Sequence, residues 1–204
     1  MPKLDITTQT RNLDAVIAGL DDPLHRRILT NYRNHAIYEI CGYKERIFEP
    51  DMTVEHPVYW VNSAEVSLEL DGLEQVLGFY QSLQDTEATV MVVTDEKLMV
   101  ADWGFASESI FHTYTTGAQI LAAEPAAGVD PDGCFIVQRR MSMIWPYDER
   151  GRMIGEHVFE HLVARRTWQI PAEEFITLEE AREKLMPLLV ELPEVPVLDA
   201  TGAR

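Results

Sequence analysis

Two carboxyl groups in the C-terminal third of the chain have a spacing that suits acid–base chemistry. Glu156, Val158 and Glu160 are two residues apart, and such residues share one face of a β-strand. If this face is turned inward, burial raises the pKa of a carboxyl group and makes it a candidate acid or base. If the strand contains a bulge, His157 and His161 point inward instead and the glutamates are solvated. We favour the first arrangement, and the second is the alternative.

Tyrosine and histidine side chains elsewhere could complete such a site. Tyr32 lies on the apolar stripe of a predicted helix, and its hydroxyl could donate a hydrogen bond in the site. Alternatively, it is a core tyrosine whose hydroxyl bonds to a backbone carbonyl. His56 is a candidate for proton transfer, because the ordinary pKa of histidine, about 6.5, suits neutral pH. Its alternative role is structural, to hold the strand in place. His112, in the middle of a predicted strand, is a weaker candidate to line the site. His35, one turn from Tyr32, could share its face, but we expect it at the surface.

Tryptophan and methionine side chains supply a candidate apolar lining. Trp60, Trp103 and Trp145, together with Met141 and Met143, would form an adaptable cavity wall. Each of them is also typical of an ordinary core, so the group is stronger evidence than any one member.

Helices are predicted to precede the strands that carry these residues. The segment 21–23, Asp-Asp-Pro, supplies a cap and a first-turn proline, and Gly42 is a plausible C-cap. Between them, apolar positions recur every four residues: Leu24, Ile28, Tyr32, Ala36 and Ile40. Shorter helices are predicted at 13–20, after Gly72, and from Thr177 to about Pro187.

Strand-forming residues dominate the second half of the chain. Segment 53–60 is also predicted to be a strand, and because of Pro57 it should lie at an edge or end in a bulge. Residues 148–151, Asp-Glu-Arg-Gly, are typical of a hairpin turn. Loop 118–133 is long enough to be either a lid over a site or a passive insertion. Further strands are predicted at residues 88–93, 97–116, 134–147 and 153–165. Helices followed by long strands indicate an α+β domain.

Three segments resemble motifs of the nuclear transport factor 2-like superfamily, in particular ketosteroid isomerases and SnoaL-like polyketide cyclases. They occur in the family's order, at residues 48–57 (FEPDMTVEHP), 72–80 (GLEQVLGFY) and 147–153 (YDERGRM). The resemblance implies a cystatin-like α+β fold, in which a curved antiparallel sheet and N-terminal helices form a cone-shaped pocket. It places this domain at 1–170, with 171–204 as a C-terminal helix and tail of the same domain or a subunit contact. It also implies a homo-oligomer, either a dimer or a trimer.

The resemblance assigns roles to individual positions. His56 stands where the isomerases have their carboxylate base, and Tyr32 stands at their oxyanion-stabilising tyrosine. Met143 stands at the second oxyanion donor, but a thioether cannot donate a hydrogen bond. Glu156 and Glu160 fall at positions of the pocket wall. Ketosteroid isomerisation itself is therefore not expected.

We expect a cofactor-independent acid–base enzyme that acts on an apolar cyclic or aromatic small molecule by elimination, isomerisation or cyclisation. His56 would remove a proton, Tyr32 would stabilise negative charge on oxygen, and Glu160 would shuttle the proton. Predicted substrate-binding residues are Trp60, Trp103, His112, Met143, Trp145 and Glu156. We slightly favour elimination, a lyase or dehydratase reaction.

Two other functions fit the same fold. A non-catalytic binding or assembly domain would have interior polar groups that are paired with one another and closed to solvent. An epoxide hydrolase would need an arginine between two carboxylates. Arg139 and Arg140 supply arginines, but no carboxylates flank them in register in the sequence.

Composition and motifs argue against other classes of ligand. The chain has 17 Lys and Arg against 34 Asp and Glu, a net charge of −17, whereas nucleic acids and anionic membranes bind basic faces. It has no apolar run of 18 residues and no signal-peptide core, so we expect a cytoplasmic location. The distant Cys41 and Cys134 should be reduced thiols. His157 and His161 are four residues apart, which suits zinc on a helix rather than a strand, and nucleotide-binding motifs are absent. We therefore expect neither metal nor cofactor.

Overall fold

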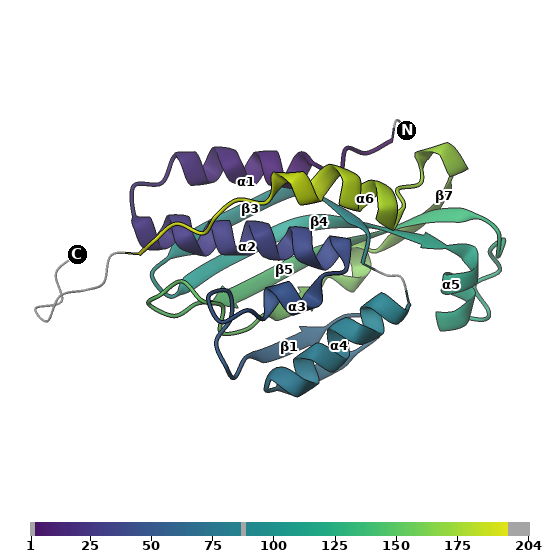
Figure 1. The fold of residues 1–204 in the computed structure, drawn as a ribbon. Helices are drawn as coiled ribbons and strands as arrows, with labels where there is room; N and C mark the ends of the chain where they lie inside the picture. Colours follow the sequence, from purple (N-terminus) through teal and green to yellow (C-terminus); the bar gives the residue numbers. More distant parts are fainter. Residues whose placement is uncertain (1–2, 87–88, 196–204) are drawn as a thin grey trace, which may run out of the picture.

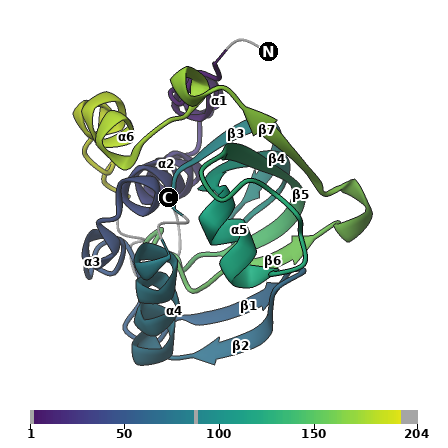
Figure 2. The same cartoon turned by 90° about the vertical axis from the view of Figure 1, so that its right-hand side faces the viewer.

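One curved sheet carries most of the helices of this protein on one side, as the computed structural model shows (Figures 1 and 2). The structure describes residues 3–86 and 89–195. The strand order is β2-β1-β6-β5-β4-β3, and β7 also pairs with β5. All pairs are antiparallel except β1 with β6. The strands are β1 Val58–Asn62, β2 Ser67–Asp71, β3 Met91–Ala101, β4 Gly104–Thr116, β5 Cys134–Pro146, β6 His157–Glu160 and β7 Arg166–Ile170.

The helices cover the face of the sheet toward which it curves. In Figure 2, α1, α2, α3, α4 and α6 lie on one side of the sheet, and α5 lies apart from them, beyond the end of β4. In the described residues no helix has the length and apolar composition needed to cross a bilayer. The helices are α1 Thr8–Ala18, α2 Pro23–Cys41, α3 Lys44–Ile47, α4 Leu73–Asp85, α5 Gly117–Ala123 and α6 Leu178–Leu185.

Helix α2 begins and ends where its sequence predicts. The Asp22 side chain accepts hydrogen bonds from the backbone N–H groups of Leu24 (2.7 Å) and His25 (3.2 Å), and Pro23 fills the first turn. Gly42 ends the helix in the left-handed conformation, with φ of 73°, which glycine adopts at little cost. This rigid helix positions both Tyr32 and His35 over the sheet.

Several predicted boundaries are wrong. The predicted strand 97–116 is a hairpin, because the chain turns at residues 102–103 between β3 and β4. The predicted strand 153–165 forms isolated bridges at Met153, a short strand at β6 and then a 3₁₀ turn at Leu162–Ala164. Pro57 lies just before β1, which is an inner strand between β2 and β6, so the edge-strand prediction fails. Long-range pairing, which local composition does not report, fixes these limits.

Some elements have little local signal. Strands β2 and β7 and helices α3 and α5 were not predicted, and α5 lies inside the predicted loop 118–133. The predicted helix at 13–20 begins earlier, as α1. Of the predicted tail, residues 196–204 lie outside the described part of the chain, as does residue 88 of the predicted strand 88–93.

Register determines which side chains face the helices. Phe105, Ser107 and Ser109 alternate along β4 and pair directly with Trp145, Met143 and Met141 of β5. All six are buried, so this face of the sheet forms the wall of the interior. The tyrosine and histidine of α2 lie against it, since the Trp145 ring is 5.0 Å from the Tyr32 ring and 5.1 Å from the His35 ring.

Candidate functional site

Tyr32 lies in the interior and is already engaged by a carboxyl group. Its hydroxyl donates to Glu96 (2.6 Å) and accepts from Gln9 (2.9 Å). A register shift between Thr94 and Lys97, with Asp95 at a positive φ of 50°, accompanies the placement of Glu96 against the helix. Burial raises the pKa of Glu96, and the Tyr32 hydrogen bond lowers it. The tyrosine proton is therefore not free for a ligand in this conformation.

A second buried carboxyl group lies with a histidine and a tyrosine from two helices. The Tyr80 hydroxyl of α4 donates to Glu156 Oε1 (2.8 Å). His35 Nε2 of α2 is 2.9 Å from the Tyr80 oxygen and 3.2 Å from the same Glu156 oxygen. Because Tyr80 uses its one proton on Glu156, the hydrogen of the His35–Tyr80 bond is assigned to Nε2. Glu156, His35 and Tyr80, the interior acid–base cluster, are each at most 6% exposed.

The surroundings of Glu156 bring its pKa into the physiological range. Burial raises the pKa to about 7, and the charge of Glu39 also raises it. His35 and the hydroxyl groups of Tyr80 and Tyr59 lower it. A carboxyl group near neutral pKa both accepts and donates protons at pH 7, as general acid–base catalysis requires.

The predicted trio Tyr32, His56 and Glu160 does not converge. The His56 side chain is 70% exposed and forms an ion pair of 2.7 Å with Asp71, so it does not face the interior acid–base cluster. Glu160 points inward as expected, but it lies at the other end of β6 from Glu156. Glu156 is buried as expected, but the histidine beside it is His35 and not His56.

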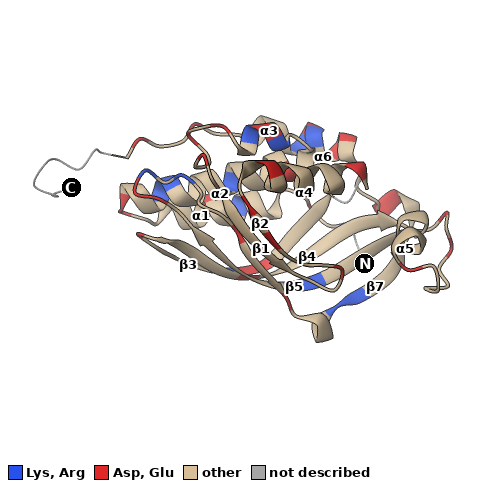
Figure 3. Ribbon diagram, turned by 90° about the horizontal axis from the view of Figure 1, so that it is seen from below, with Lys and Arg blue, Asp and Glu red and all other residues tan. Residues whose placement is uncertain are grey.

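Glu160 belongs to a cluster of opposite charges, the rim cluster, whose members come from β6, the β1–β2 turn, β5 and the turn before β7. Figure 3 shows basic residues on β5 and β7. The Glu160 side chain has no exposed surface, and its Oε1 is 3.5 Å from Arg165 and 3.9 Å from Arg139. Arg139 also contacts Glu65 (3.3 Å) and donates to Thr113 (3.0 Å). Glu65 pairs with Arg165 as well. Arg139 is thus held between two carboxylates that the sequence did not place beside it.

The predicted substrate-binding residues divide between the interior and the surface. Met143 and Trp145 are buried in the interior wall. Trp60 is 44% exposed, stacked on His157, and Trp103 is 50% exposed in the β3–β4 turn. His112 has the opposite strand parity to the interior wall, and its Nε2 lies 3.0 Å from the Thr94 hydroxyl. Of this group, Glu156 belongs to the interior acid–base cluster, and Met143 and Trp145 lie near it.

One hollow lies between helices, and another lies on the surface. A hollow of about 10 Å³, lined by Gln9, Leu13 and Ile37 among others, lies between α1 and α2. A shallow surface hollow of about 400 Å³ lies on β1, β2 and β6 around Trp60 and Phe159. Glu156 lines neither hollow, so access of a ligand to Glu156 through either of them requires movement of wall side chains. Met141 and Met143 are suited to such movement, because methionine is flexible and unbranched.

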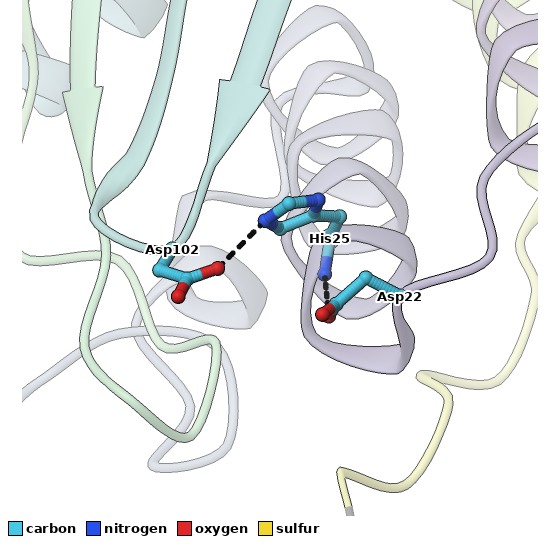
Figure 4. A group of neighbouring side chains, drawn as sticks. All are labelled: Asp22, His25 and Asp102. Carbon is cyan, nitrogen blue, oxygen red and sulfur yellow. Dashed lines mark hydrogen bonds and ion pairs between the residues drawn. The ribbon is translucent and has the colours of Figure 1, made fainter. Parts of the chain in front are cut away.

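Among residues 3–86 and 89–195, one group of side chains has a spacing that could hold a metal ion. Ligand atoms of Asp22, His25 and Asp102 lie within 4.8 Å of one another (Figure 4). Asp22 caps α2, however, and His25 Nε2 pairs with Asp102 at 2.9 Å. Helix capping and a surface ion pair account for this arrangement.

Sequence reasoning missed three residues of the interior. His35 was expected at the surface but is fully buried, and this expectation is wrong. A signal was present, since it follows Tyr32 by one helical turn on a helix that is buried over most of its circumference. Tyr80 lies in the helix predicted after Gly72, but nothing local indicates its carboxyl partner. Glu96 had no signal, because its placement depends on the irregularity in β3.

Solved structures with similar folds were found, whereas no family model and no curated protein matches the sequence. A SnoaL-like polyketide cyclase from Jannaschia sp. CCS1 has a TM-score of 0.51 at 15% identity, over 72% of this chain and 94% of that one. Bal32a, from a soil-derived mobile gene cassette, has a TM-score of 0.46 at 9% identity, over 68% and 92%. SalBIII, an epoxide hydrolase/cyclase-like enzyme of pyran ring formation in salinomycin, has 0.44 at 11% identity, over 78% and 98%.

The predicted α+β architecture is confirmed by the curved sheet, its covering helices and the similarity to the Jannaschia protein. At 15% identity this similarity establishes the fold, not the activity. The chain therefore has the nuclear transport factor 2-like fold of the SnoaL-like proteins, as its three sequence motifs predicted.

Proposed function

We propose that this protein is an acid–base enzyme that removes a proton beside the carbonyl group of an apolar cyclic compound. One observation carries the proposal: the buried Glu156 carboxyl, held by Tyr80 and His35, has a pKa raised to about 7. The sequence assigned the base to His56, and we assign it to Glu156 because His56 lies on the surface. Strongly perturbed carboxyl groups in apolar interiors are typical of functional sites.

The proposed reaction needs only proton transfer. The ionised Glu156 takes a proton from the carbon next to the carbonyl, and the electron pair of the broken C–H bond forms an enolate. The proton is returned to another carbon in isomerisation, or a leaving group departs with its electron pair in elimination. His35 and Tyr80 hold the carboxylate by hydrogen bonds during these steps. No electrons are exchanged with a cofactor in this scheme.

Deuterium exchange tests this proposal without knowledge of the natural substrate. The bicyclic ketone 1-tetralone in D₂O should gain deuterium beside its carbonyl group faster with the protein than without it. Because Glu156 must be ionised to act as the base, kcat/KM should rise with pH and reach half its maximum at a pH of about 7. Mass spectrometry of the ketone measures the rate. If neither 1-tetralone nor other cyclic ketones exchange above the buffer rate, the non-catalytic domain is the better explanation.

Epoxide hydrolysis is a second candidate because of the rim cluster. Arg139 lies between Glu65 and Glu160, with contacts of 3.3 and 3.9 Å. In such a reaction one carboxylate takes a proton from water while the water oxygen bonds to an epoxide carbon. The C–O bond breaks, and an acid supplies a proton to the resulting alkoxide. We rank this candidate second because the second arginine, Arg165, also neutralises both glutamates.

An apolar row on the outer face of the sheet supports the predicted homo-oligomer. Trp60, Ile144 and Met99 are 44%, 42% and 75% exposed. They lie in one row across the sheet, because His157 pairs with both Trp60 and Ile144, and Ala106 pairs with both Ile144 and Met99. We propose that a second copy of the chain covers this row, because exposed apolar rows mark contact surfaces.

A charge in this row should separate the copies. Trp60→Glu is expected to shift the protein from dimer to monomer in analytical ultracentrifugation. Glu69→Gln, on the neighbouring exposed position of β2, should leave the sedimentation coefficient unchanged. A monomeric unmodified protein at high micromolar concentration contradicts the proposal.

A further inference from the structure

Polar atoms of the interior wall have no hydrogen-bond partner among the described residues. Three of them belong to the strands that face the interior acid–base cluster: Ser107 Oγ, Ser109 Oγ and Trp145 Nε1. Their residues are 8%, 0% and 2% exposed. An unpaired buried donor destabilises a fold, so such groups are normally satisfied by ordered water or by a ligand.

These three side chains lie on one face and follow one line. Ser107 and Ser109 are two residues apart on β4, which separates them by about 7 Å. Trp145 on β5 pairs with Phe105 and is thus the diagonal neighbour of Ser107. Met143 and Met141 lie opposite the two serines. The line therefore offers hydrogen-bonding groups beside flexible apolar side chains.

Trp145 joins this line to the interior acid–base cluster. Its ring is edge-on to the His35 ring at 5.1 Å, and His35 reaches Glu156 at 3.2 Å. An indole N–H only donates, so its partner must be a hydrogen-bond acceptor. Tyr32 gives its proton to Glu96 and Tyr80 gives its proton to Glu156, so neither is free for this role. The buried Tyr147 hydroxyl is a further donor without a partner among the described residues.

We propose that Trp145 Nε1 and the Ser107 hydroxyl bind the carbonyl oxygen of the substrate beside the Glu156 carboxyl. This inference rests on the proposed function and adds the group that stabilises the enolate oxygen. When the C–H bond breaks, negative charge develops on this oxygen, and a buried donor stabilises it more strongly than water does. The unpaired Ser109 hydroxyl, farther along β4, favours substrates with a second oxygen about 7 Å from the first.

A Trp145→Phe variant tests the donor while it retains an aromatic ring. It should lower kcat for deuterium exchange of 1-tetralone about 100-fold, with KM changed less than about threefold, because the lost bond strengthens in the transition state. Trp168→Phe, a tryptophan on β7 next to His112, is the matched control and should keep normal kcat. A kcat of Trp145→Phe equal to that of the unmodified protein overturns the inference but leaves the proposed function standing.

Binding provides a second measurement that does not depend on turnover. The chain has four tryptophans, and the Trp145→Phe spectrum assigns the indole N–H signal of Trp145 in ¹⁵N-labelled protein. Titration with 1-tetralone should shift this signal downfield, and tetralin, the same ring system without oxygen, should not. Equal shifts with both molecules, or a shift with neither, overturn the inference even if exchange is never detected. The same titration with Trp168→Phe shows whether this readout survives an unrelated substitution.

Discussion

Replacement of Glu156 by glutamine should reduce deuterium exchange of 1-tetralone about 1,000-fold, since a positioned general base contributes roughly 10²- to 10⁴-fold. Glutamine has nearly the same shape and still accepts the hydrogen bond from Tyr80, so the packing is preserved. It cannot take up the proton. The effect should appear in kcat, with little change in KM, because the ketone is bound by other side chains.

Two further variants separate this result from the alternatives. If His56→Gln abolishes exchange and Glu156→Gln does not, the base is the exposed histidine that the sequence resemblance assigned. Glu160→Gln removes a carboxylate from the rim cluster. If the protein instead hydrolyses cyclic epoxides, this activity should be lost in Glu160→Gln and retained in Glu156→Gln. If ketone exchange is lost in Glu156→Gln and retained in Glu160→Gln, this result supports the ranking of proton removal above epoxide hydrolysis.

The free energy of unfolding should depend on pH through the same carboxyl group. Glu156 has a pKa of about 7 in the folded protein and an ordinary value of 4.5. The folded state therefore holds a proton that the unfolded state has lost between these values, and stability falls as the pH rises through this interval. The loss should be about 3 kcal/mol relative to Glu156→Gln, because each pKa unit corresponds to ~1.4 kcal/mol.

Urea unfolding at several pH values between about 4.5 and 8 measures this difference. The unfolding free energy of the unmodified protein minus that of Glu156→Gln should fall with pH and level off above about 7. Subtraction is needed because burial also raises the pKa of Glu96, which adds a dependence of the same sign. Glu179→Gln, on the exposed side of α6, is the matched control for the loss of one carboxyl group. A level difference for Glu156→Gln would mean that its carboxyl has an ordinary pKa in the folded protein.

The sequence by itself determined the elements whose signals are local. Asp22, Pro23 and Gly42 delimit α2 through hydrogen bonds and backbone conformations that involve only nearby residues. The turn that ends in Gly151, with φ of 69°, and the cap at Thr177 are of the same kind. Together with the three motifs, these signals were sufficient for the fold. Helical periodicity also placed Tyr32 correctly in the interior.

Only the tertiary structure decided which side chains meet. Tyr80 and Glu156 are 76 residues apart in the chain, and Arg165 and Glu65 are 100 apart. Strand periodicity limits each residue to one of two faces, but it does not give the register between strands or the helix that covers them. The pKa of about 7 for Glu156 follows from burial and the charge of Glu39, which raise it against the lowering effect of His35. Such burial arises only when distant segments pack together, so neither the cluster nor its chemistry could be predicted from local sequence.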